Sequence, residues 1–201
     1  MDDILHALGF VVVAGSVFLL LIAWESWVLV KQRGQTDAYA WPDVLSNISM
    51  GFLYKAVDAV VVSLIVTVLY DHVRALGMNS VPANPVLAVC LMVVVTDFTY
   101  WFVHYFMHKV RWGWVSHVSH HSSDRFNLST ALRQTSTGFL VSWVFYIPCF
   151  LVGVPANVFV TVASAHLIYQ FWIHSEHIPK LGWLEWFMVT ASNHRVHHAR
   201  N

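Results

Sequence analysis

The chain has 201 residues, of which 57% are hydrophobic and only 11% charged, whereas a soluble domain usually carries about a quarter charged residues. This composition argues against a water-soluble globular protein. Eleven Lys and Arg residues balance eleven Asp and Glu residues, so the chain has no basic field of the kind that attracts nucleic acid. Cys90 and Cys149 lie in apolar runs and indicate neither a disulfide framework nor a thiolate metal site.

The first apolar stretch follows an acidic start, Asp2 and Asp3, where a secretory signal would be basic. We therefore expect this stretch to be retained. The sequence contains no low-complexity tract, repeat or Gly/Ser-rich linker, which favours one membrane-embedded domain over residues 1–201. Within it, residues 1–84 are expected to hold two spans, and residues 85–201 a third span, a hairpin and most of the histidines.

Three stretches are long and apolar enough to cross a membrane. A bilayer hydrocarbon core of about 30 Å requires roughly 20 apolar residues in a helix, and the stretches lie near residues 8–30, 48–70 and 85–100. The third begins at Pro85, a residue well suited to the first turn of a helix, and continues into the first histidines. The sequence therefore predicts three full spans.

Residues 138–173 are apolar again, but Pro148, Gly153 and Pro155 interrupt them. Such breaks predict two helices joined by a tight turn, the first of them too short for a full crossing. The expected fold class is therefore all-α: an integral membrane helical bundle with three full spans plus a helical hairpin.

Basic residues are concentrated on one side of these spans, and cytoplasmic loops carry the excess of Lys and Arg in membrane proteins. The expected cytoplasmic group is Lys31, Arg33, Lys109, Arg111, Arg125 and Arg133. The opposite side has Asp2, Asp3, Asp71 and a single Arg74. We expect a multi-pass protein whose histidine-rich end lies at the cytoplasmic face.

Thirteen histidines stand out from this composition, and ten of them fall into four motifs: H-x-x-x-H, H-x-x-H-H, H-x-x-H and a second H-x-x-H-H. Residues three and four apart share one face of an α-helix, so each motif is expected to direct its imidazoles to one point. His6 and His72 stand alone and are expected to be structural. The ten grouped histidines are His104, His108, His117, His120, His121, His174, His177, His194, His197 and His198.

These ten histidines are the predicted metal ligands. Neutral imidazole binds iron, zinc, copper or nickel, and ten polar rings beside a bilayer would be costly without a ligand to satisfy them. One ion of four to six coordination positions cannot use ten imidazoles, whereas two nearby ions can. The sequence therefore predicts a site for two metal ions.

Two further residues are expected to serve this site. Asp97 lies seven residues before His104 in the third predicted span, and we expect it to hydrogen-bond a metal-bound imidazole. His166 lies eleven residues before His177, about three helical turns, and we expect it to line a substrate cavity deeper in the membrane.

The order and neighbours of the motifs resemble the fatty acid hydroxylase/sterol desaturase superfamily of membrane histidine-rich di-iron oxygenases, and most closely its alkylglycerol monooxygenase-like branch. The likeness covers about residues 93–201. It rests on the spacing of the histidines and on the residues around them, which are Asp97 to Trp101, His120 to Ser123, Asn127 to Gln134, Phe171 to His177 and Asn193 to His198. Family members usually continue past the last motif, so the resemblance favours a truncated or naturally minimal form for a chain that stops at Asn201.

The resemblance implies two iron ions that use dioxygen and two electrons to hydroxylate or desaturate a C–H bond of a lipid, such as a sterol, a fatty acyl chain or an alkyl ether. The sequence has no haem-attachment, iron–sulfur or dinucleotide motif. The electrons are therefore expected from an external donor, either tetrahydrobiopterin or a separate reductase. The expected location is a bacterial inner membrane or the endoplasmic reticulum.

Two alternative functions agree less well with the sequence. A membrane-embedded zinc hydrolase would need three ligands and typically an H-E-x-x-H motif, which the sequence lacks. A non-enzymatic protein that carries haem or metal ions would need histidines in the middle of the membrane, whereas these histidines lie at the ends of the predicted spans. Both alternatives predict a different metal content from the oxygenase.

Overall fold

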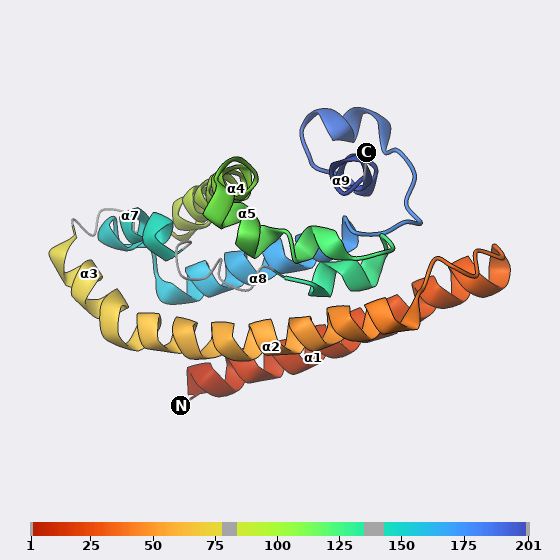
Figure 1. Cartoon of the computed structure of the whole chain (residues 1–201). Helices are drawn as coiled ribbons and strands as arrows, with labels where there is room; N and C mark the ends of the chain where they lie inside the picture. The colour runs from red at the N-terminus through yellow and green to blue at the C-terminus, as the bar shows by residue number, and fades with distance from the viewer. Residues whose placement is uncertain (1, 78–83, 135–142, 200–201) are drawn as a thin grey trace. The chain divides into compact units, whose positions relative to one another are not determined.

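The computed structural model describes residues 2–77, 84–134 and 143–199, and all regular structure within them is helical (Figure 1). The all-α expectation is confirmed for this part of the chain. The elements are α1 (Asp2–Trp27), η1 (Val28–Gln32), α2 (Trp41–Leu64), η2 (Ile65–Tyr70), α3 (Asp71–Leu76), α4 (Pro85–Lys109), α5 (Arg111–His117), η3 (His120–Ser122), η4 (Leu128–Leu132), η5 (Trp143–Tyr146), α7 (Ile147–Leu151), α8 (Ala156–Trp172), η6 (Gly182–Trp186) and α9 (Ala191–His197).

The chain forms two compact units that interleave along the sequence. Unit 1 comprises Met1–Ser49, Ser123–Arg133 and Ile168–Asn201, and unit 2 comprises Met50–Ser122 and Gln134–Leu167. Each unit therefore joins segments that are far apart in the chain. The histidine motifs are divided between the two units.

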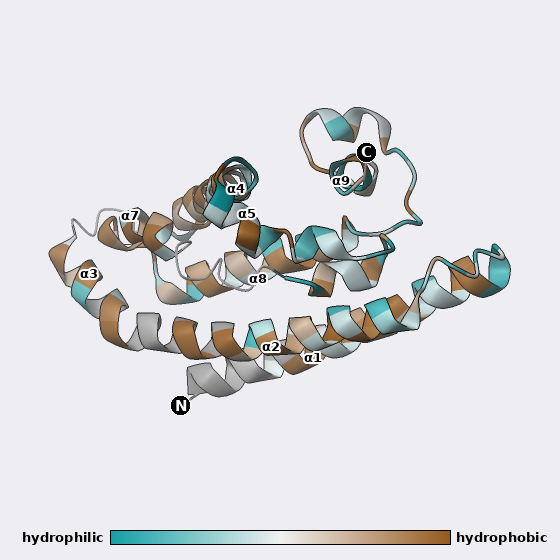
Figure 2. Cartoon of the chain, viewed as in Figure 1, coloured by the Kyte–Doolittle hydropathy of each residue, from teal (hydrophilic) through white to brown (hydrophobic). Residues whose placement is uncertain are grey.

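Two helices are long and apolar enough to cross a membrane: Val12–Gln32, which joins most of α1 to η1, and Pro85–Lys109, which is α4. In each helix, only 22% of the most apolar 18-residue stretch is buried within the protein. On α4 the outward side chains include Val94 and Phe98, which are 66% and 57% exposed. Figure 2 shows apolar residues through much of α4. Such exposed apolar faces suit a lipid environment better than water.

The second predicted span is helical, because α2 continues through η2 to Tyr70. The described part of the chain contains no further helix beyond the two above that meets the length and hydropathy of a span. The expected count of three full spans therefore stays a prediction.

The described part of the predicted hairpin consists of the short helix α7, a turn and the helix α8. One detail of the prediction is wrong. Residues 135–142 lie outside the described part of the chain, so the expected start at residue 138 is not seen. Pro148 does not interrupt a helix but lies in the first turn of the short helix α7, where its missing N–H costs nothing. Gly153 makes the turn between α7 and α8 with a φ of 94°. Residues other than glycine rarely adopt this backbone conformation.

Each unit has an apolar core. In unit 1, Phe18 of α1 stacks on Phe171 at the end of α8, with ring centroids 4.0 Å apart, and the cluster includes the fully buried Leu29. In unit 2, Met92 of α4 packs in a cluster with Cys149. The stacking of Phe18 on Phe171 lies at the end of α8, three residues before His174, and the Met92 cluster packs the first half of α4.

Candidate metal centre

The first histidine cluster belongs to unit 2 and begins on α4. His104 and His108 are one helical turn apart, and their Nε2 atoms lie 3.2 Å from each other. His117 of α5 faces both rings, with centroid separations of 4.6 and 4.7 Å. His121 completes the group, since its Nε2 lies 3.1 Å from that of His117. The ligand atoms of these four histidines all lie within 4.8 Å of one another.

The turn between α4 and α5 brings these rings together. Val110 is extended, with φ −109° and ψ 127°, and ends α4. The following helix then packs closely on α4 at Gly113, where an added Cβ would lie only 3.0 Å from the Cα of Met107. Glycine is therefore needed for the approach that carries His117 to His104 and His108.

The first cluster favours uncharged imidazole. Burial, and then the neighbouring imidazoles of His104 and His120, lower the pKa of His117 far below its usual value. A neutral imidazole keeps a nitrogen lone pair, which is the form that ligates a metal.

The second cluster belongs to unit 1. The Nε2 of His194 on α9 lies 3.0 Å from the Nε2 of His174 and 3.1 Å from that of His198. His174 and His194 are almost completely buried, at 2% and 4% exposed. Phe126 covers the group, with its ring 5.8 Å from that of His174 and 5.2 Å from that of His198.

Hydrogen bonds around the second cluster fix its orientation. The Nδ1 of His174 lies 2.8 Å from the backbone carbonyl of Gln170. A carbonyl can only accept, so Nδ1 carries the proton and Nε2 presents its lone pair to the cluster. At the start of α9, the Glu185 carboxylate accepts hydrogen bonds from the hydroxyls of Ser192 and Thr190. The bond from Ser192 lowers the pKa of Glu185.

The other three predicted ligands are His120, His197 and His177. The His120 ring is 5.3 Å from that of His117, and the His197 ring is 5.4 Å from that of His194, so both are next to a cluster in their own unit. His177 instead packs edge-on against Trp24, with centroids 5.3 Å apart. The ligand roles of all ten histidines stay predictions.

The prediction that every motif lies on an α-helix is wrong for two of them. His117 is the last residue of α5, and His120 and His121 follow in the short 3-10 helix η3. Helix α8 ends at Trp172, so His174 and His177 lie in the turns beyond it. The chain bends at both places, and the rings converge through these bends rather than along one helix face.

Because α8 ends at Trp172, the predicted position of His166 relative to His177 is also wrong. His166 and His177 are not on one helix, so the expected rise between them does not apply. Within unit 2, the Nε2 of His166 lies 3.9 Å from an Asp97 carboxylate oxygen, and its ring is 5.1 Å from that of Tyr100. Asp97 therefore faces His166 in the structure. Its expected hydrogen bond to a metal-ligating ring stays a prediction.

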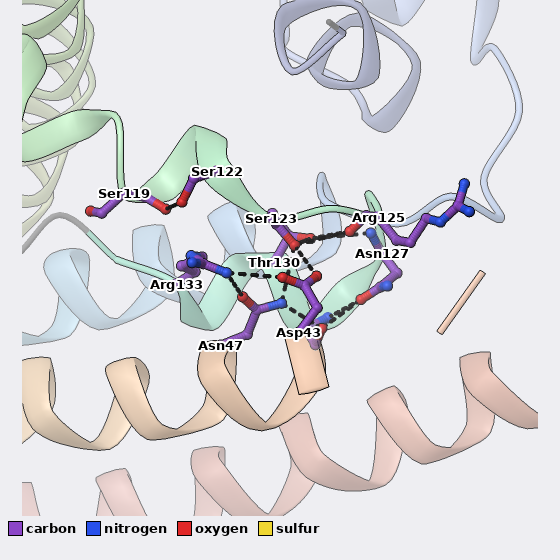
Figure 3. Close-up of polar contacts among 10 residues, drawn as sticks. Asp43, Asn47, Ser119, Ser122, Ser123, Arg125, Asn127, Thr130 and Arg133 are labelled. Atoms are coloured by element: carbon purple, nitrogen blue, oxygen red, sulfur yellow. Dashed lines mark hydrogen bonds and ion pairs between the residues drawn. The ribbon is translucent and has the colours of Figure 1, made fainter. Parts of the chain in front are cut away.

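A buried polar network that the sequence did not predict supports the second cluster (Figure 3). Arg133 donates to Asp43 at 2.9 Å and to Asn47 at 3.1 Å, and Ser123 donates to Asp43 at 2.6 Å. Asn47 is fully buried. The network ties the segment that carries Phe126 to the start of α2, across more than 75 residues of sequence.

The two clusters fit a transition metal. In each, imidazole nitrogens face one another at 3.0–3.2 Å, and a single proton on His194 can satisfy only one of its two neighbours. A cation that accepts several lone pairs satisfies all of them. The donors are nitrogen only, which favours iron, zinc, copper or nickel over the oxygen-preferring magnesium and calcium.

An all-helical chain with exposed apolar helices and two all-histidine clusters is a candidate membrane metalloprotein. The chain belongs to the fatty acid hydroxylase family, whose sequence model matches residues 89–201. The resemblance seen in the motifs is thereby confirmed, and the match covers every histidine of both clusters.

Several curated proteins named alkylglycerol monooxygenase are similar to this chain. The Homo sapiens protein is 36% identical over 187 residues, which are 91% of this chain and 40% of that protein. The Xenopus tropicalis protein is 48% identical over 105 residues, 52% of this chain and 23% of the relative. The Caenorhabditis elegans protein is 29% identical over 190 residues, 92% of this chain and 37% of the relative. The chain thus spans less than half the length of these relatives. No solved structure matches it.

Proposed function

We propose that this protein is a membrane non-haem di-iron oxygenase that hydroxylates, or desaturates, a C–H bond of a lipid. The observation that carries the proposal is the pair of all-imidazole clusters, each with converging Nε2 atoms. Membership of the fatty acid hydroxylase family supports iron over zinc. The names of the relatives supply the reaction class, a monooxygenase.

Each cluster would hold one iron ion. His104, His108, His117 and His121 are the proposed ligands of one, and His174, His194 and His198 those of the other. His120, His197 and His177 complete the proposed set of ten. When bound, iron would supply the dioxygen chemistry that these side chains lack. The chain's own contribution is to keep the imidazoles neutral, to orient them through bonds such as His174 to Gln170, and to exclude water with Phe126.

The substrate is proposed to be a lipid that enters from the bilayer. The outward faces of α1 and α4 are apolar, which suits a protein embedded among its substrates. An alkyl ether is favoured by the relatives' name, and a sterol or a fatty acyl chain has the same aliphatic C–H bonds. The protein is proposed to lie in a bacterial inner membrane or the endoplasmic reticulum, with the metal ions at the cytoplasmic face. No nucleic acid is involved.

The reaction needs two electrons that the chain does not provide. Its sequence carries no haem-attachment motif, Cys-rich cluster motif or dinucleotide fingerprint. An external donor, either tetrahydrobiopterin or a separate reductase, is therefore part of the proposal.

The test is turnover with dioxygen labelled with a heavy oxygen isotope. The purified chain is loaded with ferrous iron in one sample and with zinc in another, and supplied with a chemical reductant and a mixture of lipids. We expect the iron sample alone to place the label in a lipid hydroxyl, or to give a product two hydrogens lighter if it desaturates. Lipid hydrolysis supported by zinc, with no oxidation by iron, would identify a zinc hydrolase instead.

Asp97 and His166 are proposed to bind the polar part of the lipid. They face each other at 3.9 Å between the largely apolar helices α4 and α8, and an ionisable pair in a membrane segment is usually functional. Tyr100 lies beside His166 and, at 5.6 Å, beside His104. This geometry supports a binding role near the first cluster. We also propose that Asp97 hydrogen-bonds an imidazole that ligates the metal.

Replacing His166 with phenylalanine separates a lining role from a ligand role. Phenylalanine keeps the ring breadth and removes both nitrogens, so we expect near-normal iron content and a changed preference among lipids. The control is Tyr100→Phe, which keeps the ring beside His166. Iron content that fell by about half in His166→Phe would make His166 a ligand and overturn the proposed lining role.

A further inference from the structure

Glu25 is a buried carboxylate in a helix that is apolar enough to span a membrane. It lies within the candidate span Val12–Gln32 and is 0% exposed. A charged group in such a segment is costly unless it is fully partnered. Glu25 is fully partnered, and its partners come from all three segments of unit 1.

Each oxygen of Glu25 accepts two hydrogen bonds. Oε2 accepts from the Tyr39 hydroxyl at 2.6 Å and from the backbone N–H of Leu128 at 2.8 Å. Oε1 accepts from the Ser175 hydroxyl at 2.7 Å and from the backbone N–H of Glu176 at 3.1 Å. A backbone N–H can only donate, so both oxygens must act as acceptors. A carboxylate meets this requirement, and an amide does not.

The two bonds to Oε1 hold the chain immediately after His174. Helix α8 has ended at Trp172. The backbone N–H of Ser175 still donates to the carbonyl of Trp172 at 3.1 Å, whereas the N–H of Glu176 donates to Oε1 of Glu25. Arg195, the neighbour of His194 on α9, donates to the carbonyl of Ser175 at 2.8 Å. The turn that carries His174 is thus held from α1 by Glu25 and from α9 by Arg195.

We propose that Glu25 is a positioning residue for the second cluster, which fixes the direction of the His174 imidazole by holding the turn that follows it. The inference rests on the proposed function, since it takes His174, His194 and His198 as ligands. Groups that orient a metal ligand from outside the coordination sphere typically change metal affinity about 10–100-fold when they are removed.

Two single substitutions separate positioning from stability. Ser175→Ala removes a donor to Oε1, on the side of the His174 turn, and Tyr39→Phe removes a donor to Oε2, on the opposite side. Each deletes one buried hydrogen bond to the same carboxylate, so each should lower the unfolding temperature. Ser175→Ala also removes the acceptor of the His177 backbone N–H, which lies 3.1 Å from the Ser175 hydroxyl, so its effect includes both bonds of the turn. Only the first should alter the metal site. Glu25→Gln must leave one backbone N–H facing the amide N–H₂ and should show both effects.

The experiment is a titration of the 201-residue chain with cobalt(II), followed by its visible absorption. Thermal unfolding of the metal-free protein is measured beside it. We expect Ser175→Ala and Glu25→Gln to bind one of two cobalt ions about tenfold more weakly, with the other ion unchanged. Tyr39→Phe should bind both ions as the unmodified chain does.

Two results would overturn the inference alone: equal cobalt affinities in Ser175→Ala and the unmodified chain, or equal weakening in Ser175→Ala and Tyr39→Phe. If the unmodified chain bound no cobalt, the proposed function would fail and the inference with it. The two failures are therefore distinguishable.

Discussion

Replacing His121 with alanine is expected to abolish lipid oxidation and to remove about one of two iron ions. His121 supplies one of four imidazoles in the first cluster, and its Nε2 lies 3.1 Å from that of His117. Loss of a direct ligand should exceed the roughly 10–100-fold cost of losing a partner outside the coordination sphere. Activity in a lipid hydroxylation assay should therefore fall by more than about a hundredfold.

The helices should survive this substitution, because their apolar faces do not depend on the metal. Circular dichroism and membrane extraction should thus be unchanged in His121→Ala. His72→Ala is the matched control, since His72 is an exposed histidine of α3 outside both clusters, and it should keep full activity and iron. Full iron content and turnover in His121→Ala would show that the first cluster is not a metal site.

The helices that carry the histidines could be predicted from the sequence because their signals are local. Pro85 begins α4 as expected, and the four-residue spacing of His104 and His108 suffices to bring two Nε2 atoms within 3.2 Å. Both depend only on helix geometry. The pair His104 and His108 therefore follows from spacing alone, whereas His117 joins it only through the turn at Val110.

The second cluster depends on features that spacing does not encode. His174 meets His194 only after the chain has left α8 and passed through η6 into α9. The predicted position of His166 is wrong for the same reason, because it required the helix to continue to His177. A helix that ends without a proline or glycine gives no local signal of its end.

The polar residues that hold the second cluster could not be paired from the sequence. Arg133 donates a hydrogen bond to Asp43, which is 90 residues away in the sequence. Glu25 accepts a hydrogen bond from Ser175, which is 150 residues away. Such partners are defined by tertiary packing. One signal was nevertheless present, since an isolated glutamate near the end of an apolar stretch requires partners wherever it is buried.

The division of the histidines into two clusters predicts two iron ions per chain. Four imidazoles converge in unit 2 and three in unit 1, and each set is suited to one ion of a transition metal. All proposed ligands are neutral nitrogens, so the ions should bind without haem or sulfide. A protein that carried haem would instead show its strong visible absorption.

The measurement that tests this account most directly is the number of iron ions per chain after anaerobic loading with ferrous iron and removal of unbound metal. The account predicts about two irons per chain, no haem absorption, and about one iron in each of His121→Ala and His194→Ala. One iron or fewer in the unmodified chain at saturating iron, or two irons retained in both variants, would contradict it.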